Sequence, residues 1–247
     1  YWSLVLAEDC FVNTLDSNIP ECPFPVRFSS ITALSSQYSR EQITIRASLV
    51  ATAMREWLQS DGSTNNRTRL SPMLGLSWNF SKGMYLRAGY KEGFRMPTFN
   101  DLYYARVGNV NLRPETARQI NLGLTCTSVA GWGNCGGSID FYCNQINDKI
   151  TAVPTMFIWK MQNIGKALMY GSDISIYGTT KLNEHIRLHW SGSYSLQYAI
   201  DITDPDQKNY KHQIPYTPRH SGNGHITLEL PWLNLTYRGI YTGKRYK

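Results

Sequence analysis

The segment from Ile186 to Tyr198 alternates between two kinds of residue along its whole length. One series of positions, which begins with Ile186, Leu188 and Trp190, is apolar or aromatic apart from one glycine, whereas every intervening position is polar. Alternation with period two predicts a β-strand with one apolar and one polar face. The segment exceeds the usual strand of about five or six residues. It suits a tilted membrane-spanning strand, which needs about nine to eleven.

The same period recurs along the rest of the chain. It is clear from Ile43 to Met54 and from Leu74 to Phe80. A third segment, Met84 to Tyr90, follows the short turn Ser81-Lys82-Gly83, and this arrangement predicts a hairpin. Weaker signals predict strands at 2–15, 31–38, 120–124, 139–143, 174–176, 226–228 and 233–241, with a tight turn at Pro231-Trp232. Together these segments predict about ten or eleven strands.

The composition favours a membrane β-barrel. Hydrophobic residues make up 42% of the chain, aromatic residues 13% and charged residues only 17%. No stretch approaches the roughly 20 uninterrupted apolar residues of a spanning helix, and a closed barrel is the other structure that satisfies its backbone inside a bilayer. A soluble β-sandwich remains an alternative on patterning alone. Strand length and aromatic content favour the barrel, with residues 1–247 as one domain.

The net charge and the cysteines give weaker indications. The charge of +7 and the pI of about 9.1 come from scattered basic residues. We therefore expect contacts with anionic lipid and no binding of nucleic acid. The cysteines, Cys10, Cys22, Cys126, Cys135 and Cys143, lack the paired spacing of a zinc site. Cys126 and Cys135 flank a glycine-rich connection, so they either form a disulfide or are small apolar strand residues.

Two connections are long for a compact soluble domain but normal on the outer rim of a barrel, where ligand is met. They run from Lys91 to Ala117 and from Asp201 to Ser221. The second contains Asp201, Asp204 and Asp206, which are either calcium ligands or, as we favour, a solvated acidic turn. We expect no metal site.

The sequence between Tyr85 and Gly123 resembles the barrel of TonB-dependent outer-membrane receptors. In that family a strand ending in Phe-Arg-x-Pro-Thr precedes an outer loop, and Gly-Asn-x-Asn-Leu-x-Pro-Glu leads into the next strand. The matching residues here are Phe94, Arg95, Pro97, Thr98, Asn100, Asp101, Leu102, Gly108, Asn109, Asn111, Leu112, Pro114 and Glu115. Pro97 lacks a donor and ends a ladder, while Asn100 and Asp101 can turn the backbone. We interpret the motif as structural.

Further segments extend the resemblance. Asn147–Ile150, Trp159–Lys166 and Tyr170–Ile174 are similar to a strand pair of these receptors, and Tyr210–Ser221 is similar to their Pro-Tyr-x-Pro-x-His segment. The resemblance covers most of the chain from about Arg69 onward. The first sixty residues fit by strand pattern only.

The resemblance implies a partial antiparallel transmembrane β-barrel, about half of a 22-stranded one, in the outer membrane of a Gram-negative bacterium. It implies that the chain begins and ends within a longer protein, with a plug domain and TonB-binding box elsewhere. Such receptors use TonB to import scarce ligands. The spacing is most similar to Bacteroidetes-type siderophore and cobalamin receptors, with cobalamin slightly preferred over a ferric siderophore. Outer-membrane lipids or lipopolysaccharide and a surface lipoprotein are further implied partners, and no cofactor is implied.

Several residues on the predicted outer loops can contact a corrin or a metal chelate, although loop aromatics often only pack locally. These candidates are Tyr103, Tyr104, Arg106, Tyr210 and His212.

Two other functions stay open. A passive porin would share the strands but lack a plug. An outer-membrane hydrolase would need a serine, a histidine and an acid on one side of the barrel. His189 and Ser191 share a polar strand face, but no nucleophile motif accompanies them. We interpret them as polar residues of the lumen.

Overall fold

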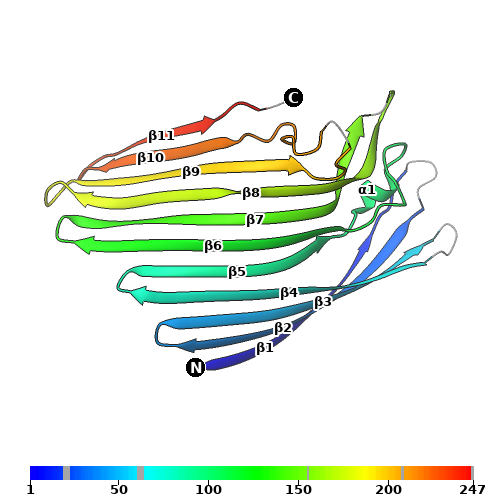
Figure 1. Cartoon of the computed structure of the whole chain (residues 1–247), viewed down its shortest axis with the longest axis horizontal. Helices are drawn as coiled ribbons and strands as arrows, with labels where there is room; N and C mark the ends of the chain where they lie inside the picture. Colours follow the sequence, from blue (N-terminus) through cyan, green and yellow to red (C-terminus); the bar gives the residue numbers. More distant parts are fainter. Residues whose placement is uncertain (19–22, 60–63, 155, 207–208, 246–247) are drawn as a thin grey trace.

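The computed structural model describes residues 1–18, 23–59, 64–154, 156–206 and 209–245. They form one antiparallel sheet in which each of the eleven strands pairs with the next in sequence (Figure 1). The strands are β1 (Trp2–Thr14), β2 (Pro25–Arg40), β3 (Ile43–Leu58), β4 (Thr64–Ser81), β5 (Met84–Arg95), β6 (Glu115–Ala130), β7 (Gly133–Pro154), β8 (Trp159–Lys181), β9 (Arg187–Asp201), β10 (His220–Glu229) and β11 (Asn234–Thr242). The all-β antiparallel prediction is confirmed.

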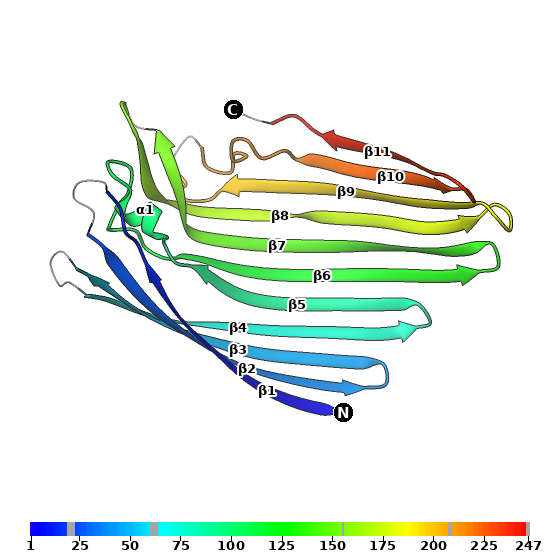
Figure 2. The same ribbon diagram turned by 180° about the vertical axis from the view of Figure 1, so that it is seen from behind.

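The two ends of the sheet differ in their connections. Short turns join the strands at one end, which we call the turn end, while the longer connections gather at the other, the loop end (Figures 1 and 2). The longest of these are residues 96–114 and 202–219, which we call the β5–β6 loop and the β9–β10 loop. The first contains a short helix, α1 (Phe99–Tyr103). Among the described residues, no helix is long and apolar enough to cross a membrane.

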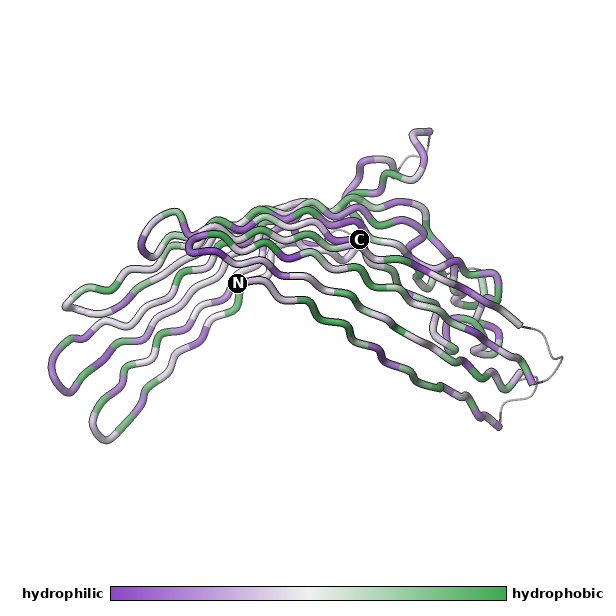
Figure 3. Tube along the Cα trace, turned by 90° about the horizontal axis from the view of Figure 1, so that it is seen from below, coloured by the Kyte–Doolittle hydropathy of each residue, from purple (hydrophilic) through white to green (hydrophobic). Residues whose placement is uncertain are grey.

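The strand register produces two chemically different faces. Trp78 lies opposite Ile43 and Leu86, and this row continues through Leu124 and Ile139. We call the side that carries this row the apolar face. The next row contains Arg87, Gly123, Asp140 and Asp173, and its side is the polar face. Figure 3 shows the resulting alternation of hydrophobic and hydrophilic residues along the strongly curved sheet.

The predicted strands are confirmed, but most extend further than their alternating segments. The segment predicted at 139–143 belongs to β7, which has 22 residues, and the predicted connection from Lys91 to Ala117 shrinks because β5 and β6 extend into it. Strand ends outside an apolar belt need no apolar residues, so alternation cannot reveal them. Asn100 and Asp101, predicted to turn the backbone, instead lie in α1. Thr98 caps this helix through a capping box with Asp101.

The disulfide alternative for Cys126 and Cys135 is wrong in this structure. Cys126 lies opposite Gly137 and Cys135 opposite Ser128, so the two cysteines are offset by two positions. Both are free thiols, as are Cys10 and Cys143. Cys22 lies outside the described residues. The interpretation as small strand residues agrees with this arrangement.

Gly83, in the β4–β5 turn, has a φ of 75°, and an added Cβ would lie 2.2 Å from the carbonyl oxygen of Thr127. We predict that Gly83→Ala lowers the free energy of unfolding by at least about 1 kcal/mol, because alanine disfavours positive φ and the contact is with backbone. Urea unfolding of the folded barrel in detergent measures this change. Gly93→Ala is the control, since nothing lies within 4 Å of an added Cβ there. Equal stability of both variants would contradict the prediction.

Candidate functional site

The β5–β6 loop folds against the polar face at the loop end of the sheet. Leu102 and Leu112 from the loop form a buried cluster with Ile150 of β7. Tyr103 of the loop and Met161 of β8 pack against this cluster. In β7 and β8, the side chains of Ile150 and Met161 alternate with those of the apolar face. Both residues therefore belong to the polar face. The loop therefore has an apolar core of its own on the otherwise polar side of the sheet.

A buried ion pair between β2 and β3 anchors the same loop. Arg27 and Glu56 approach to 2.5 Å, and their side chains are only 11% and 7% exposed. Tyr103 donates its hydroxyl hydrogen bond to Glu56 at 2.5 Å. Arg27 donates to the carbonyl oxygen of Pro97 at 2.9 Å and lies 4.6 Å from the ring centroid of Phe99. Because burying unpaired charge is costly, each partner here depends on the others.

Arginines at the two ends of the loop make further ion pairs. Arg95, at the end of β5, pairs with Asp101 at 3.2 Å and with Glu115 at 3.3 Å. Arg113, just before β6, pairs with Asp148 of β7 at 2.5 Å. These pairs link the end of β5 to α1 and to the start of β6, and the end of the loop to β7.

Hydrogen bonds from β8 complete the attachment. The side-chain amide of Asn163 donates to the carbonyl oxygens of Arg113 and Asp148, at 2.9 and 2.7 Å. The backbone N–H of Met161 donates to Val107 at 2.8 Å. The β7–β8 hairpin thus holds the loop through side chains and backbone.

The motif residues take up distinct places in this arrangement. Phe94 and Arg95 end β5, and Glu115 begins β6. Pro97, Leu112 and Pro114 are buried. Thr98, Asn100, Asp101 and Leu102 form the cap and body of α1. Their contacts lie within the protein.

The second half of the motif has equally specific contacts. Gly108 leaves no room for a side chain, because an added Cβ would lie 2.6 Å from the carbonyl oxygen of Leu102. The amide of Asn109 donates to the carbonyl oxygen of Met161 and accepts from the N–H of Asn111. This half of the loop is thereby fixed against both α1 and β8.

The candidate ligand contacts fall into two groups on different loops. On the β5–β6 loop, Tyr104 is 55% exposed and Arg106 is exposed, whereas Tyr103 is half-buried and bonded to Glu56. On the β9–β10 loop, Tyr210 is half-buried and His212 is exposed. The structure therefore presents Tyr104, Arg106 and His212 outward and uses the hydroxyl of Tyr103 within the protein.

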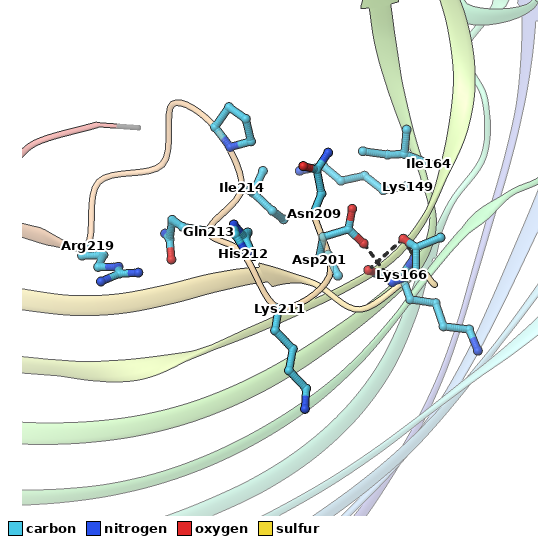
Figure 4. Close-up of a pocket in the computed structure, with 13 residues that line it drawn as sticks. Lys149, Ile164, Lys166, Asp201, Asn209, Lys211, His212, Gln213, Ile214 and Arg219 are labelled. Atoms are coloured by element: carbon cyan, nitrogen blue, oxygen red, sulfur yellow. Dashed lines mark hydrogen bonds between the residues drawn. The ribbon is translucent and has the colours of Figure 1, made fainter. Parts of the chain in front are cut away.

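A cavity of about 540 Å³ lies where the β9–β10 loop meets β8 and β9 (Figure 4). The loop folds back along β9, with Lys211 donating to the carbonyl oxygen of Asp201 and Ile214 to that of Ala199, both at 2.7 Å. The lining residues are Lys149, Ile164, Lys166, Ala167, Asp201, Thr203, Asn209, Lys211, His212, Gln213, Ile214, Pro215 and Arg219. Of these residues, His212 was predicted from the sequence as a ligand contact and Asp201 as part of an acidic turn. Lys149 and Lys166 continue the series of alternate positions that is apolar further along β7 and β8. This alternation could have marked both lysines in the sequence.

Asp201, the last residue of β9, and Asp204 of the β9–β10 loop act as turn residues. Asp201 accepts the backbone N–H of Thr203 at 2.8 Å, and Asp204 accepts that of Asp206 at 3.1 Å. Within the part of the chain that the structure describes, no three His, Cys, Asp or Glu residues are placed to hold a metal ion. The acidic-turn interpretation fits these contacts better than the calcium alternative.

The residues of the hydrolase alternative form two separate pairs. His189 lies 2.7 Å from the carboxylate of Glu229, while Ser191 lies 2.8 Å from His225. The acid and the serine therefore contact different histidines. These four residues do not form the serine, histidine and acid relay that such chemistry uses.

The sequence from residue 8 to residue 247 matches the family model described as TonB dependent receptor-like, beta-barrel. The chain belongs to this family. Receptors of the family are β-barrels of the Gram-negative outer membrane, so the polar face corresponds to the lumen and the apolar face to the lipid side.

Among curated relatives, the receptor chain is 22% identical over 230 residues to the vitamin B12 transporter BtuB of Photobacterium profundum. The match covers 88% of this chain but only 35% of that relative, so the chain spans about a third of its length.

Two solved structures show the same fold. The copper transporter OprC superposes with a TM-score of 0.72 at 14% identity, over 92% of this chain and 39% of that one. The siderophore receptor PirA from Acinetobacter baumannii gives a TM-score of 0.56 at 12% identity, over 99% of this chain and 43% of that one.

We predict that Glu56→Gln destabilises the attachment of the β5–β6 loop by about 3 kcal/mol, because it leaves the buried charge of Arg27 without its partner. Limited trypsin digestion should then cleave faster at Arg106, which is exposed on the loop. Glu92→Gln is a matched control, since its pair with Arg118 is more exposed and contributes less than about 1 kcal/mol. Unchanged cleavage in Glu56→Gln would show that the ion pair does not hold the loop.

Proposed function

We propose that this chain is part of an outer-membrane receptor that imports cobalamin or a ferric siderophore with energy from TonB. The family match over residues 8–247 carries the proposal. The alignment of 88% of the chain with a vitamin B12 transporter supports cobalamin as the first choice. The superposition on a siderophore receptor supports the fold in which either ligand would be carried. The protein moves its ligand without changing a bond in it, so it is not an enzyme.

The arrangement of the loop end suits the first step of such import. Tyr104 and Arg106 on one loop and His212 on another present exposed side chains where an external ligand arrives. An aromatic ring and a cation suit the flat face and acidic groups of a large chelate. TonB would act on a plug elsewhere in the protein. A Bacteroidetes-type receptor with a surface lipoprotein remains part of the proposal.

Binding of ligand to the protein at its full natural length, purified in detergent, tests the proposal. We expect cyanocobalamin or one of a panel of ferric siderophores to bind in isothermal titration calorimetry. Tyr104→Ala and Arg106→Ala should each weaken that binding about tenfold, because each removes an exposed side chain that we propose contacts the ligand. Val110→Ala, an exposed position of the same loop, is the control. Binding that is unchanged in both variants would remove these residues from the site.

Uptake by cells separates active import from passive diffusion. We expect uptake of the bound ligand to stop when TonB is absent. A passive porin would still admit the ligand, because diffusion through an open channel needs no energy transducer. Uptake that is equal with and without TonB would therefore overturn the proposal in favour of a porin.

A further inference from the structure

The pairing between β4 and β5 stops before either strand ends. Their last register pair toward the loop end is Met73 with Lys91, although β4 begins at Thr64 and β5 continues to Arg95. Residues 64–72 of β4 therefore pair with β3 alone. Figures 1 and 2 show β5 turning toward α1 while β4 extends further beside β3. One edge of β4, which we call the open edge, is consequently left without a neighbouring strand at the loop end.

A proline explains where the pairing stops. The backbone N–H of Asn79 donates to Gln42, just before β3, so the odd-numbered residues of β4 direct their backbone groups toward β3. The even-numbered residues direct theirs toward β5, because the direction alternates along a strand. The first even-numbered residue beyond the last pair is Pro72, which has no N–H to donate. The pairing with β5 thus ends where its donor is missing.

Beyond Pro72, the open edge presents the backbone N–H and C=O groups of Leu70, Thr68 and Asn66. Among the described residues, no backbone group pairs with them on this edge. Leu70 is 61% exposed, and Asn66 and Thr68 are exposed as well. An open hollow of about 370 Å³ is lined by residues 66–69. Unpaired groups along an exposed strand are a template for pairing with a further strand.

The side chains around the open edge carry positive charge. Arg67 and Arg69 belong to the polar face of β4, and Arg55 of β3 lies opposite Asn66 on the other face. In the part of the chain that the structure describes, no carboxylate forms an ion pair with any of these three arginines. Pairing of two copies of this edge would bring like charges together, which is unfavourable. An acidic strand would instead be attracted to it.

We propose that the open edge of β4 binds an extended, acidic segment of another protein by strand addition. The alternation of β4 sets the pattern that this segment needs. Its side chains beside Arg67 and Arg69 are acidic, and those beside Thr68 and Leu70 are apolar or β-branched. The backbone groups of the open edge supply the hydrogen bonds. This interaction is separate from the import function and does not depend on which ligand is carried.

Fluorescence anisotropy with the protein at its full natural length in detergent tests the proposal. The probe is a short labelled peptide in which glutamate alternates with valine. A peptide of the same composition with its glutamates in one block should bind about tenfold more weakly, because it cannot place acids on one face only. N-methylation of the amides along one edge of the alternating peptide should abolish binding, whereas N-methylation along the other edge should not, because an added strand uses one edge.

Thr68→Pro tests the open edge from the side of the receptor. The N–H of Thr68 points away from β3, so proline removes a donor from the open edge and leaves the pairing of β3 with β4 intact. We expect this variant to bind the alternating peptide about tenfold more weakly. Thr68→Ala is the matched control, because it keeps the N–H and should bind as the wild-type protein does. Arg69→Gln should weaken binding about threefold, as for one exposed charge pair.

Several results would contradict the proposal. Equal binding of the alternating and the block peptide would show that charge alone attracts them. Equal binding by Thr68→Pro and Thr68→Ala would show that the backbone of the edge is not used, and the N-methylated peptides test the same contact without changing the protein. A dimer in detergent that Thr68→Pro dissociates, without binding of the peptide, would assign the edge to a second copy of the chain.

Discussion

Pairing between neighbouring strands is the constraint on which the rest of this molecule depends. The backbone of each strand forms hydrogen bonds with its neighbouring strands, and the order β1 to β11 follows the chain without a crossover. In a bilayer this is the one way for extended backbone to satisfy its polar groups. Once the register is set, period two assigns each side chain to the lumen or to the lipid. The two loops and the cavity are then built on positions that the ladder has already fixed.

The inner side of the loop end shows how polar chemistry can build a local core. Arg27 and Glu56 stand on strands far from the β5–β6 loop in sequence, yet they are buried by it. The apolar cluster of Leu102, Leu112 and Ile150 lies beside them. Neither part would be stable alone, because the ion pair needs exclusion of water and a cluster this small buries little apolar surface. Together they give a long loop a defined conformation.

Much of the strand content and the family could be predicted from sequence, because alternation and the motif around Pro97 and Pro114 are local signals. The strand ends could not, since outside the apolar belt the pattern loses its physical cause. Arg27 and Glu56 could not be assigned a role either, because their partners are 70 and 47 residues away in the chain. The cavity lysines required knowledge of register. The alternation along each strand shows which face the lysines are on, but only the pairing of β7 with β8 places Lys149 beside Ile164.

In the β7–β8 hairpin, alternate residues face opposite sides of the sheet and make different contacts. In the paired stretches 148–154 and 159–166, one set of side chains has lumen parity and ties down a loop, and the interleaved set has the parity of the apolar face. A one-residue insertion in this stretch would exchange the two sets, with aspartate and asparagine turned to the lipid and lysine turned to the interior. Within the two paired strands, change is therefore restricted to substitutions and to insertions of even length, whereas an insertion between the strands leaves both faces as they are.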